Sequence, residues 1–164
     1  MSTHTQGRNS LPRPWRASSR LTAGTLAASG TSPSLTIEAA DTVDADATLE
    51  FDAGTTTAVQ LNIYGGNPSN GGLALFDFNG GTLTAPDRLA MAGLSKIDAE
   101  DDITVNGELT VTVNGGDNFA TEATLDVLPG EVISVEKIEV GGAQACTLIV
   151  VSESHTALQT DGTP

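Results

Sequence analysis

Residues 103–113 read ITVNGELTVTV, and every large apolar side chain in this stretch occupies an odd position. Successive side chains of a β-strand point to opposite faces, so this spacing places the apolar side chains on one face. The stretch therefore predicts a half-buried strand. It fits either one long strand with Gly107 facing inward or a hairpin that turns at Asn106 and Gly107.

The same alternation recurs along most of the chain and predicts the fold. We expect strands at residues 35–39, 47–52, 57–64, 73–78, 103–113, 122–128, 131–140 and 145–151. Gly-Gly or Asn-Gly pairs, which favour tight turns, occur at residues 65–66, 70–71, 79–80, 114–115 and 141–142. About eight strands joined by tight turns predict an all-β fold, an antiparallel β-sandwich with jelly-roll-like topology.

Three local patterns refine this prediction. Helical spacing of apolar residues after Pro86 predicts one short helix over residues 87–97. A change of phase near Glu136 and Lys137 predicts a β-bulge. Residues 146–151, which are apolar on both faces, predict a central strand in which Cys146, the only cysteine, is a buried structural thiol.

The composition divides the chain into three parts. Residues 1–34 combine Ser, Thr, Pro and Gly with four arginines, and predict a flexible basic N-terminal arm. This arm fits either an unstructured leader or a segment that orders against acidic neighbours. Residues 35–151 form the expected β-sandwich domain, and residues 152–164 form a polar C-terminal tail.

The charge of the chain is strongly negative. Its formal value is -14, from 21 acidic and seven basic residues, and only two of the basic residues are lysines. All 21 acids lie in residues 35–164, which carry three basic residues and a net charge of -18. Salt screens such a surface, since the Debye length is roughly 3 Å at 1 M salt. The composition predicts a protein adapted to high salt; the alternative is an acidic protein of an ordinary environment.

No pattern of residues predicts catalysis, so we expect no enzyme, no catalytic residue and no cofactor-binding residue. The two histidines, His4 and His155, lie in the predicted arm and tail, where no rigid neighbourhood would orient a base. The glycine-rich stretch at residues 65–72 lacks the Lys-Ser/Thr of a phosphate-binding loop.

Acidic clusters raise the question of a metal site. Carboxylates occur at Asp41, Asp44 and Asp46, and again at Asp98, Glu100, Asp101 and Asp102. Calcium prefers such oxygen ligands, but the spacing does not match an EF-hand. Solvated loops that attract cations nonspecifically are the favoured interpretation, so no metal ligand is predicted.

The charge and the apolar runs also bear on partners. An acidic domain disfavours nucleic acid, except through the arginines of the arm. No run of residues is long and apolar enough to predict a membrane span, and the N-terminus lacks the apolar region of a signal peptide. We therefore expect an unprocessed, soluble protein.

A basic arm ahead of an acidic sandwich without catalytic groups resembles the virion structural proteins of haloarchaeal viruses. The resemblance rests on architecture and composition and implies a non-enzymatic capsid, capsid-decoration or other virion protein. Such a protein would form a homo-oligomer, with copies of itself and other virion proteins as partners, and would be assembled in the host cytoplasm at high salt. The alternative is a haloarchaeal cell-surface or secreted β-sandwich binding module, and a small enzyme is the third hypothesis.

Overall fold

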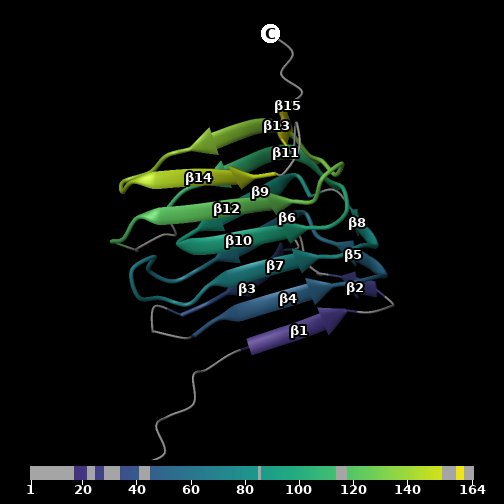
Figure 1. Ribbon diagram of the computed structural model, residues 1–164, viewed down its shortest axis with the longest axis horizontal. Helices are drawn as coiled ribbons and strands as arrows, with labels where there is room; N and C mark the ends of the chain where they lie inside the picture. The colour runs from purple at the N-terminus through teal and green to yellow at the C-terminus, as the bar shows by residue number, and fades with distance from the viewer. Residues whose placement is uncertain are drawn as a thin grey trace, which may run out of the picture.

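A computed structural model describes residues 17–21, 25–27, 34–40, 45–84, 86–113, 118–152 and 158–160. This part of the chain contains strands and no helix, so the all-β prediction is confirmed. The strands pair in parallel and wind as a β-solenoid of about four turns (Figure 1). The prediction of an antiparallel, jelly-roll-like sandwich is therefore wrong.

Three sheets run along the solenoid. The first sheet contains, in spatial order, β1 (Ala17–Leu21), β4 (Ala47–Phe51), β7 (Ala74–Phe78), β10 (Leu94–Ala99), β12 (Thr121–Val127) and β14 (Cys146–Val151). The second sheet contains β3 (Ser34–Glu38), β6 (Gln60–Tyr64), β9 (Arg88–Ala92), β11 (Ile103–Val111), β13 (Ile133–Val140) and β15 (Leu158–Thr160). A small third sheet contains β2 (Thr25–Ala27), β5 (Thr55–Thr57) and β8 (Thr82–Thr84).

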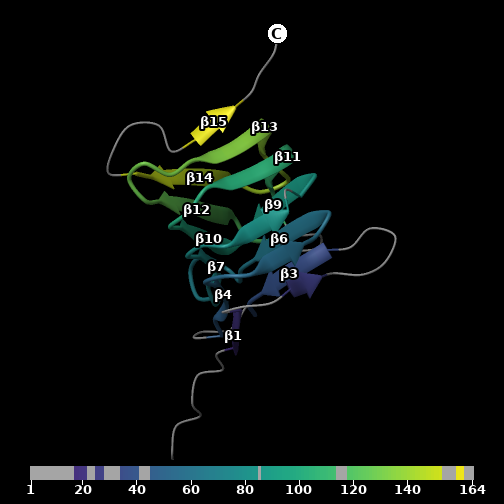
Figure 2. The ribbon, with the colours of Figure 1, turned by 90° about the vertical axis from the view of Figure 1, so that its right-hand side faces the viewer.

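The chain passes from the first sheet to the second before it returns, which explains the parallel pairing. Ala47 pairs with Ala74 in the first sheet, and Gln60 pairs with Arg88 in the second. Neighbours in a sheet are thus separated by a whole coil of sequence. The first and second sheets face each other across the core, as Figure 2 shows from the side.

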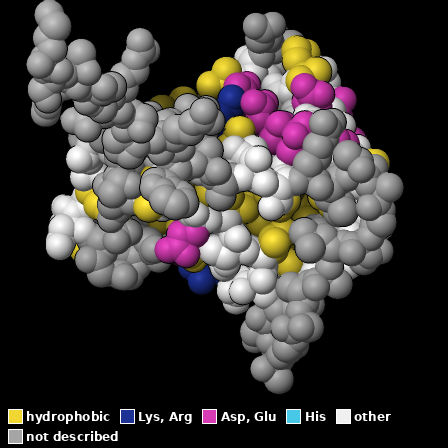
Figure 3. All heavy atoms as spheres, turned by 90° about the horizontal axis from the view of Figure 1, so that it is seen from below, with side chains coloured by type: hydrophobic (Ala, Val, Ile, Leu, Met, Phe, Trp, Pro, Cys, Tyr) yellow, Lys and Arg dark blue, Asp and Glu magenta, His cyan; other side chains and the backbone are white. Residues whose placement is uncertain are grey.

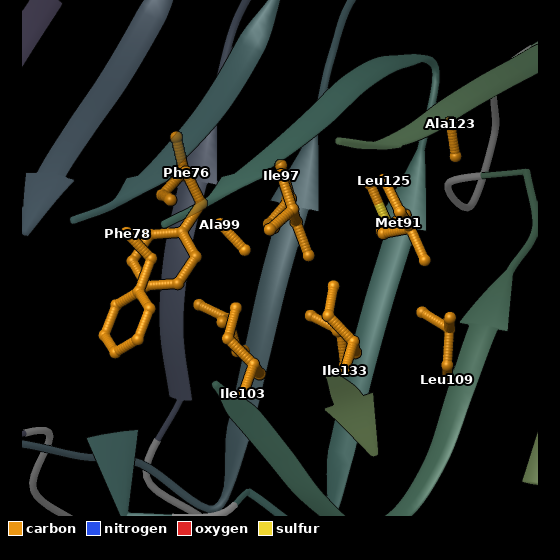
Figure 4. Packing of buried hydrophobic residues seen from close by; sticks show 14 of the residues in the cluster. Phe76, Phe78, Met91, Ile97, Ala99, Ile103, Leu109, Ala123, Leu125 and Ile133 are labelled. Carbon is orange, nitrogen blue, oxygen red and sulfur yellow. The ribbon is translucent and has the colours of Figure 1, made fainter. Parts of the chain in front are cut away.

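The core lies between these two sheets and consists of the inward side chains of every coil. Figure 4 shows Phe76 and Ile97 of the first sheet pointing toward the space that Ile103 and Ile133 of the second sheet also fill. Phe51 and Phe78 stack with ring centroids 5.6 Å apart. The largest fully buried side chains are Phe51, Phe76, Phe78, Leu61, Ile63, Leu89, Met91, Ile97, Ile103, Leu109, Leu125 and Ile133.

Polar residues at the corners repeat from coil to coil. The amide of Asn79 donates to the carboxylate of Asp52 at 3.1 Å, and these residues occupy equivalent corners of neighbouring coils. The Asn62 amide donates to the Thr36 hydroxyl at 3.2 Å in the second sheet. Stacking of equivalent residues therefore satisfies polar groups as well as burying apolar ones.

The predicted strands are placed correctly, but their connections are not. Each of the eight predicted segments overlaps an observed strand. Within residues 103–113, Ile103–Val111 form the single strand β11, so the hairpin alternative is excluded. The glycine pairs at 65–66 and 79–80 lie at corners of coils and do not form hairpins, because the strands that they join belong to different sheets. The pair at residues 114–115 lies outside the described residues.

The short helix predicted at residues 87–97 is also wrong. This segment forms β9 and most of β10, separated by a corner at Gly93, whose φ is +61°. Leu89, Met91 and Ile97 are fully buried at positions that alternate along the two strands. The inward residues keep odd positions on both sides of the corner. The helical spacing came from Ala90 and Leu94, at even positions, which do not belong to the core cluster.

The β-bulge predicted near Glu136 and Lys137 corresponds to a shift of register between β11 and β13. Its additional residue, however, belongs to β11: Asn106 and Gly107 lie between positions paired with Val135 and Lys137.

The strands β1 and β2 lie within residues 1–34, the segment interpreted as an arm, and β15 lies within the segment interpreted as a tail. Residues 1–16, 153–157 and 161–164 lie outside the described residues.

Candidate functional site

The strand at the C-terminal end of the first sheet exposes a row of large apolar side chains. Ile149, Val150 and Val151 of β14 retain 39%, 42% and 42% of their accessible surface. We call these three residues the C-terminal edge. Among the described strands, β14 pairs only with β12, so the other side of β14 has free backbone groups. The prediction that this strand is central is therefore wrong.

The register explains why both faces of β14 are apolar. Leu148 and Val150 continue the inward rows of Ala123 and Leu125, whereas Ile149 and Val151 lie on the outer face beside Thr124 and Asp126. The strand reads CTLIVV, without a charged residue or a proline. Proteins usually protect an exposed edge strand with such residues because a bare edge can pair with another chain. The C-terminal edge is thus available for strand addition.

The opposite end of the solenoid is hollowed. A cavity of about 360 Å³ is lined by Ser19, Leu35, Thr36, Ile37, Glu38, Ala47, Thr48 and Leu49. These residues belong to β1, β3 and β4, so the cavity lies where the core ends between the first two sheets. Figure 3, which views the molecule from the β1 side, shows hydrophobic side chains reaching the surface at this end.

A row of carboxylates crosses the outer face of the first sheet. Glu50 pairs with Asp77, Asp77 with Asp98, and Asp98 with Asp126. Acidic side chains gather over this sheet in Figure 3. Adjacent strands are about 4.8 Å apart, so the negative charges repel one another.

One lysine neutralises part of this row. The ammonium of Lys96 lies 2.9 Å from a carboxylate oxygen of Asp98 and 2.8 Å from one of Asp126. Partial burial would lower the pKa of Lys96, but hydrogen bonds to Asp126 and Asp98 outweigh it, so the pKa is raised. Lys96 is therefore charged and links Asp98, on its own strand, to Asp126 on the neighbouring strand.

Asp77, farther along the row, forms no ion pair with Lys96. Its carboxyl therefore tests whether repulsion within the row affects the stability of the fold. Partial burial, followed by the negative charges of Asp98, Glu50 and Glu100, raises the pKa of its carboxyl, and a hydrogen bond with Asn79 opposes the rise. A raised pKa means that the folded state binds a proton more tightly than the unfolded chain does, so ionised Asp77 opposes folding at neutral pH.

We expect Asp77→Asn to raise the free energy of unfolding at pH 7. The gain should shrink as the pH falls through the pKa of folded Asp77, and disappear below the ordinary aspartate pKa of about 4. Urea unfolding at several pH values measures both effects. Glu122→Gln, on the same face of β12 but outside the row, is the control for loss of one negative charge. An Asp77→Asn protein less stable than wild type at pH 7 would contradict the argument.

The described members of the predicted acidic clusters have structural contacts. A carboxylate oxygen of Asp46 accepts a hydrogen bond from the Leu73 amide at 2.9 Å, and Asp102 accepts one from the Val132 amide at 2.8 Å. Both bonds tie one coil to the next. Asp41 and Asp44 lie outside the described residues, as do His4 and His155. Within the described ranges, His, Cys, Asp and Glu form no group of three that could hold a metal ion.

Cys146 lies at the start of β14 and is half-buried, and its thiol lies 3.6 Å from the carbonyl oxygen of Gln144. The prediction of a buried structural thiol is therefore wrong, because the strand is at an edge. In the part of the chain that the structure describes, no helix has the length and apolar character needed to cross a membrane.

The alternation of β14 alone gave no sign that this strand ends a sheet. A signal was available in the repeat of residues 47–57, ATLEFDAGTTT, as residues 74–84, ALFDFNGGTLT. A repeat of this length indicates a solenoid, whose terminal coils have unpaired edges.

Comparison of the chain with protein families, with curated proteins and with solved structures finds no match.

Proposed function

We propose that this protein is a non-catalytic structural protein that self-associates through the edge strands of its solenoid. The observation that carries the proposal is the C-terminal edge, where Ile149, Val150 and Val151 are exposed on a strand that has a described neighbour on one side only. Burial of apolar surface contributes about 25 cal/mol per Å², and strand pairing adds main-chain hydrogen bonds. Both terms favour association with another sheet edge.

The charge of the protein supports association in concentrated salt. A net charge of -14 separates copies in dilute buffer, whereas salt screens the repulsion and strengthens apolar burial. That the protein belongs to the virion of a haloarchaeal virus, or to the surface of a haloarchaeal cell, stays a prediction. The resemblance to capsid proteins rested partly on an expected β-sandwich. Because the fold is a β-solenoid, the proposal rests on the exposed sheet edge instead.

We expect Ile149→Lys to weaken self-association by at least about tenfold, because a lysine on an edge strand blocks pairing. Light scattering during size exclusion in molar potassium chloride measures the mass. Thr104→Lys is the matched control: Thr104 is exposed on β11, which has paired strands on both sides. This control should assemble like wild type, and circular dichroism should show that both variants fold.

Two results would contradict the proposal. A wild-type protein that stays monomeric in both dilute and molar salt would show that the edge does not associate. Equal assembly of the Ile149→Lys and wild-type proteins would show that association uses a different surface.

A further inference from the structure

We infer that copies join head to tail: β14 of one copy pairs in parallel with β1 of the next, so that the solenoid continues from copy to copy. This inference rests on the proposed self-association and names its partner surface. The alternative arrangement is tail to tail, in which β14 pairs with β14 of a second copy across a two-fold axis. Two-fold pairing would be antiparallel.

The strand directions fit the head-to-tail arrangement. All strand pairs of the first sheet are parallel, and β1 and β14 are its two edge strands among those described. In a parallel sheet, alternate residues bond to the neighbour on either side, so the free groups of β14 match those of β1 in a continued register. The second sheet has β3 at the same end as β1, and β15 beyond β13 at the other end.

The register predicts which residues would meet. Inward pairing runs from Ser19 through Leu49, Phe76, Ile97 and Leu125 to Val150. Continued across the junction, it places Val150 of one copy beside Ser19 of the next, and Ile149 beside Ser18.

The hollow at the N-terminal end fits this placement. Ser19 lines the cavity of about 360 Å³, together with the apolar side chains of Leu35, Ile37 and Leu49. Val150 faces inward on β14 and is 42% exposed. A neighbouring copy would therefore bring an exposed core side chain over an unfilled end of the core.

Charge distinguishes head-to-tail from tail-to-tail association. Residues 1–34 carry four arginines and no acid, and Arg20 lies in β1 itself. Residues 118–164, which include the last coils, carry seven acids and one lysine. Head-to-tail pairing places β1, the strand that contains Arg20, against the end of the solenoid whose described residues 118–152 carry five acids and one lysine. Tail-to-tail contact brings two such acidic ends together.

Disulfide trapping with two single-cysteine proteins tests the inference. One protein carries Ser18→Cys and the other Ile149→Cys, both with Cys146→Ser. In the continued register these positions are on adjacent strands, where Cα atoms are about 5 Å apart, within the range of a disulfide. The proteins are mixed in molar potassium chloride under mild oxidation, and intact mass spectrometry identifies the linked pairs.

We expect the mixed disulfide to exceed either homodisulfide by about tenfold, because pairing raises the effective concentration of the two thiols. A dominant disulfide between two Ile149→Cys chains would overturn head-to-tail pairing and establish a tail-to-tail contact. Assembly in light scattering without a mixed disulfide would overturn the inference but leave the proposed function intact. Monomers in both measurements would overturn both.

Discussion

Val111→Asp is expected to prevent the chain from folding. Val111 is fully buried in β11 and pairs with Met91 on one side and Val140 on the other. An unpartnered charge in such a position costs about 3–5 kcal/mol, and the lost packing of the buried valine adds to this cost. A whole domain is stable by only about 5–15 kcal/mol, so most or all of the stability is removed. Circular dichroism and urea unfolding in molar potassium chloride measure the loss.

Thr104→Asp provides the matched control for this substitution. Thr104 lies on the same strand, but its side chain is exposed on the outer face. This variant should unfold close to the wild-type urea midpoint. A soluble, folded Val111→Asp protein with the wild-type midpoint would show that the inward face of β11 is assigned wrongly.

Gly65→Ala should destabilise the fold because Gly65 lies against the backbone of the next coil. Its amide donates to the carbonyl oxygen of Ala92 at 2.8 Å, and a Cβ atom here would lie 1.7 Å from the carbonyl oxygen of Leu94. The atoms in the way are backbone atoms, so the coils must move apart. We expect a loss of roughly 3 kcal/mol or more in the free energy of unfolding, at the upper range for overpacking.

Gly141→Ala separates this steric effect from the general effect of replacing glycine. A Cβ atom at Gly141 meets no heavy atom within 4 Å. Urea unfolding of the two variants should therefore differ strongly, with Gly141→Ala close to wild type. Similar stabilities for both variants would contradict the close approach of the coils at Gly65.

Local alternation predicted strands in eight segments and many of the residues that face the core, such as Leu49, Phe51 and Leu125. It missed β9 and β10, which were predicted as a helix. Strand direction was not predictable in the same way, because inward and outward alternation is identical in a hairpin and in a coil. Glycine pairs did not resolve this, since tight hairpins and solenoid corners both need residues with unusual backbone angles.

The spacing between equivalent residues contained the missing information. Ala47, Phe51 and Gly54 recur as Ala74, Phe78 and Gly81. The first two pairs are neighbours in the first sheet. The repeat is visible in two coils and blurred elsewhere, because the third sheet contains no described strand after β8 and the coils change length.

The candidate site was predicted only in its composition. The apolar character of residues 146–151 and the opposite charges of the two ends of the chain are visible in the sequence. Their meaning depends on topology: an apolar strand is buried in the middle of a sheet but exposed at its edge. The same six residues therefore predicted a core strand but lie at an exposed edge of the described sheet.

The stacking of Asp52 on Asn79, one coil apart, bears on how the length of such a chain can change during evolution. Each coil contacts mainly the coils directly before and after it, so a coil can be duplicated or lost while its neighbours keep their register. A single inserted residue within a strand instead turns every following side chain of that strand to the opposite face. Gain or loss of a whole coil, such as the 27 residues that separate Asp52 and Asn79, is therefore expected to disturb the fold less than insertion of one residue within a strand.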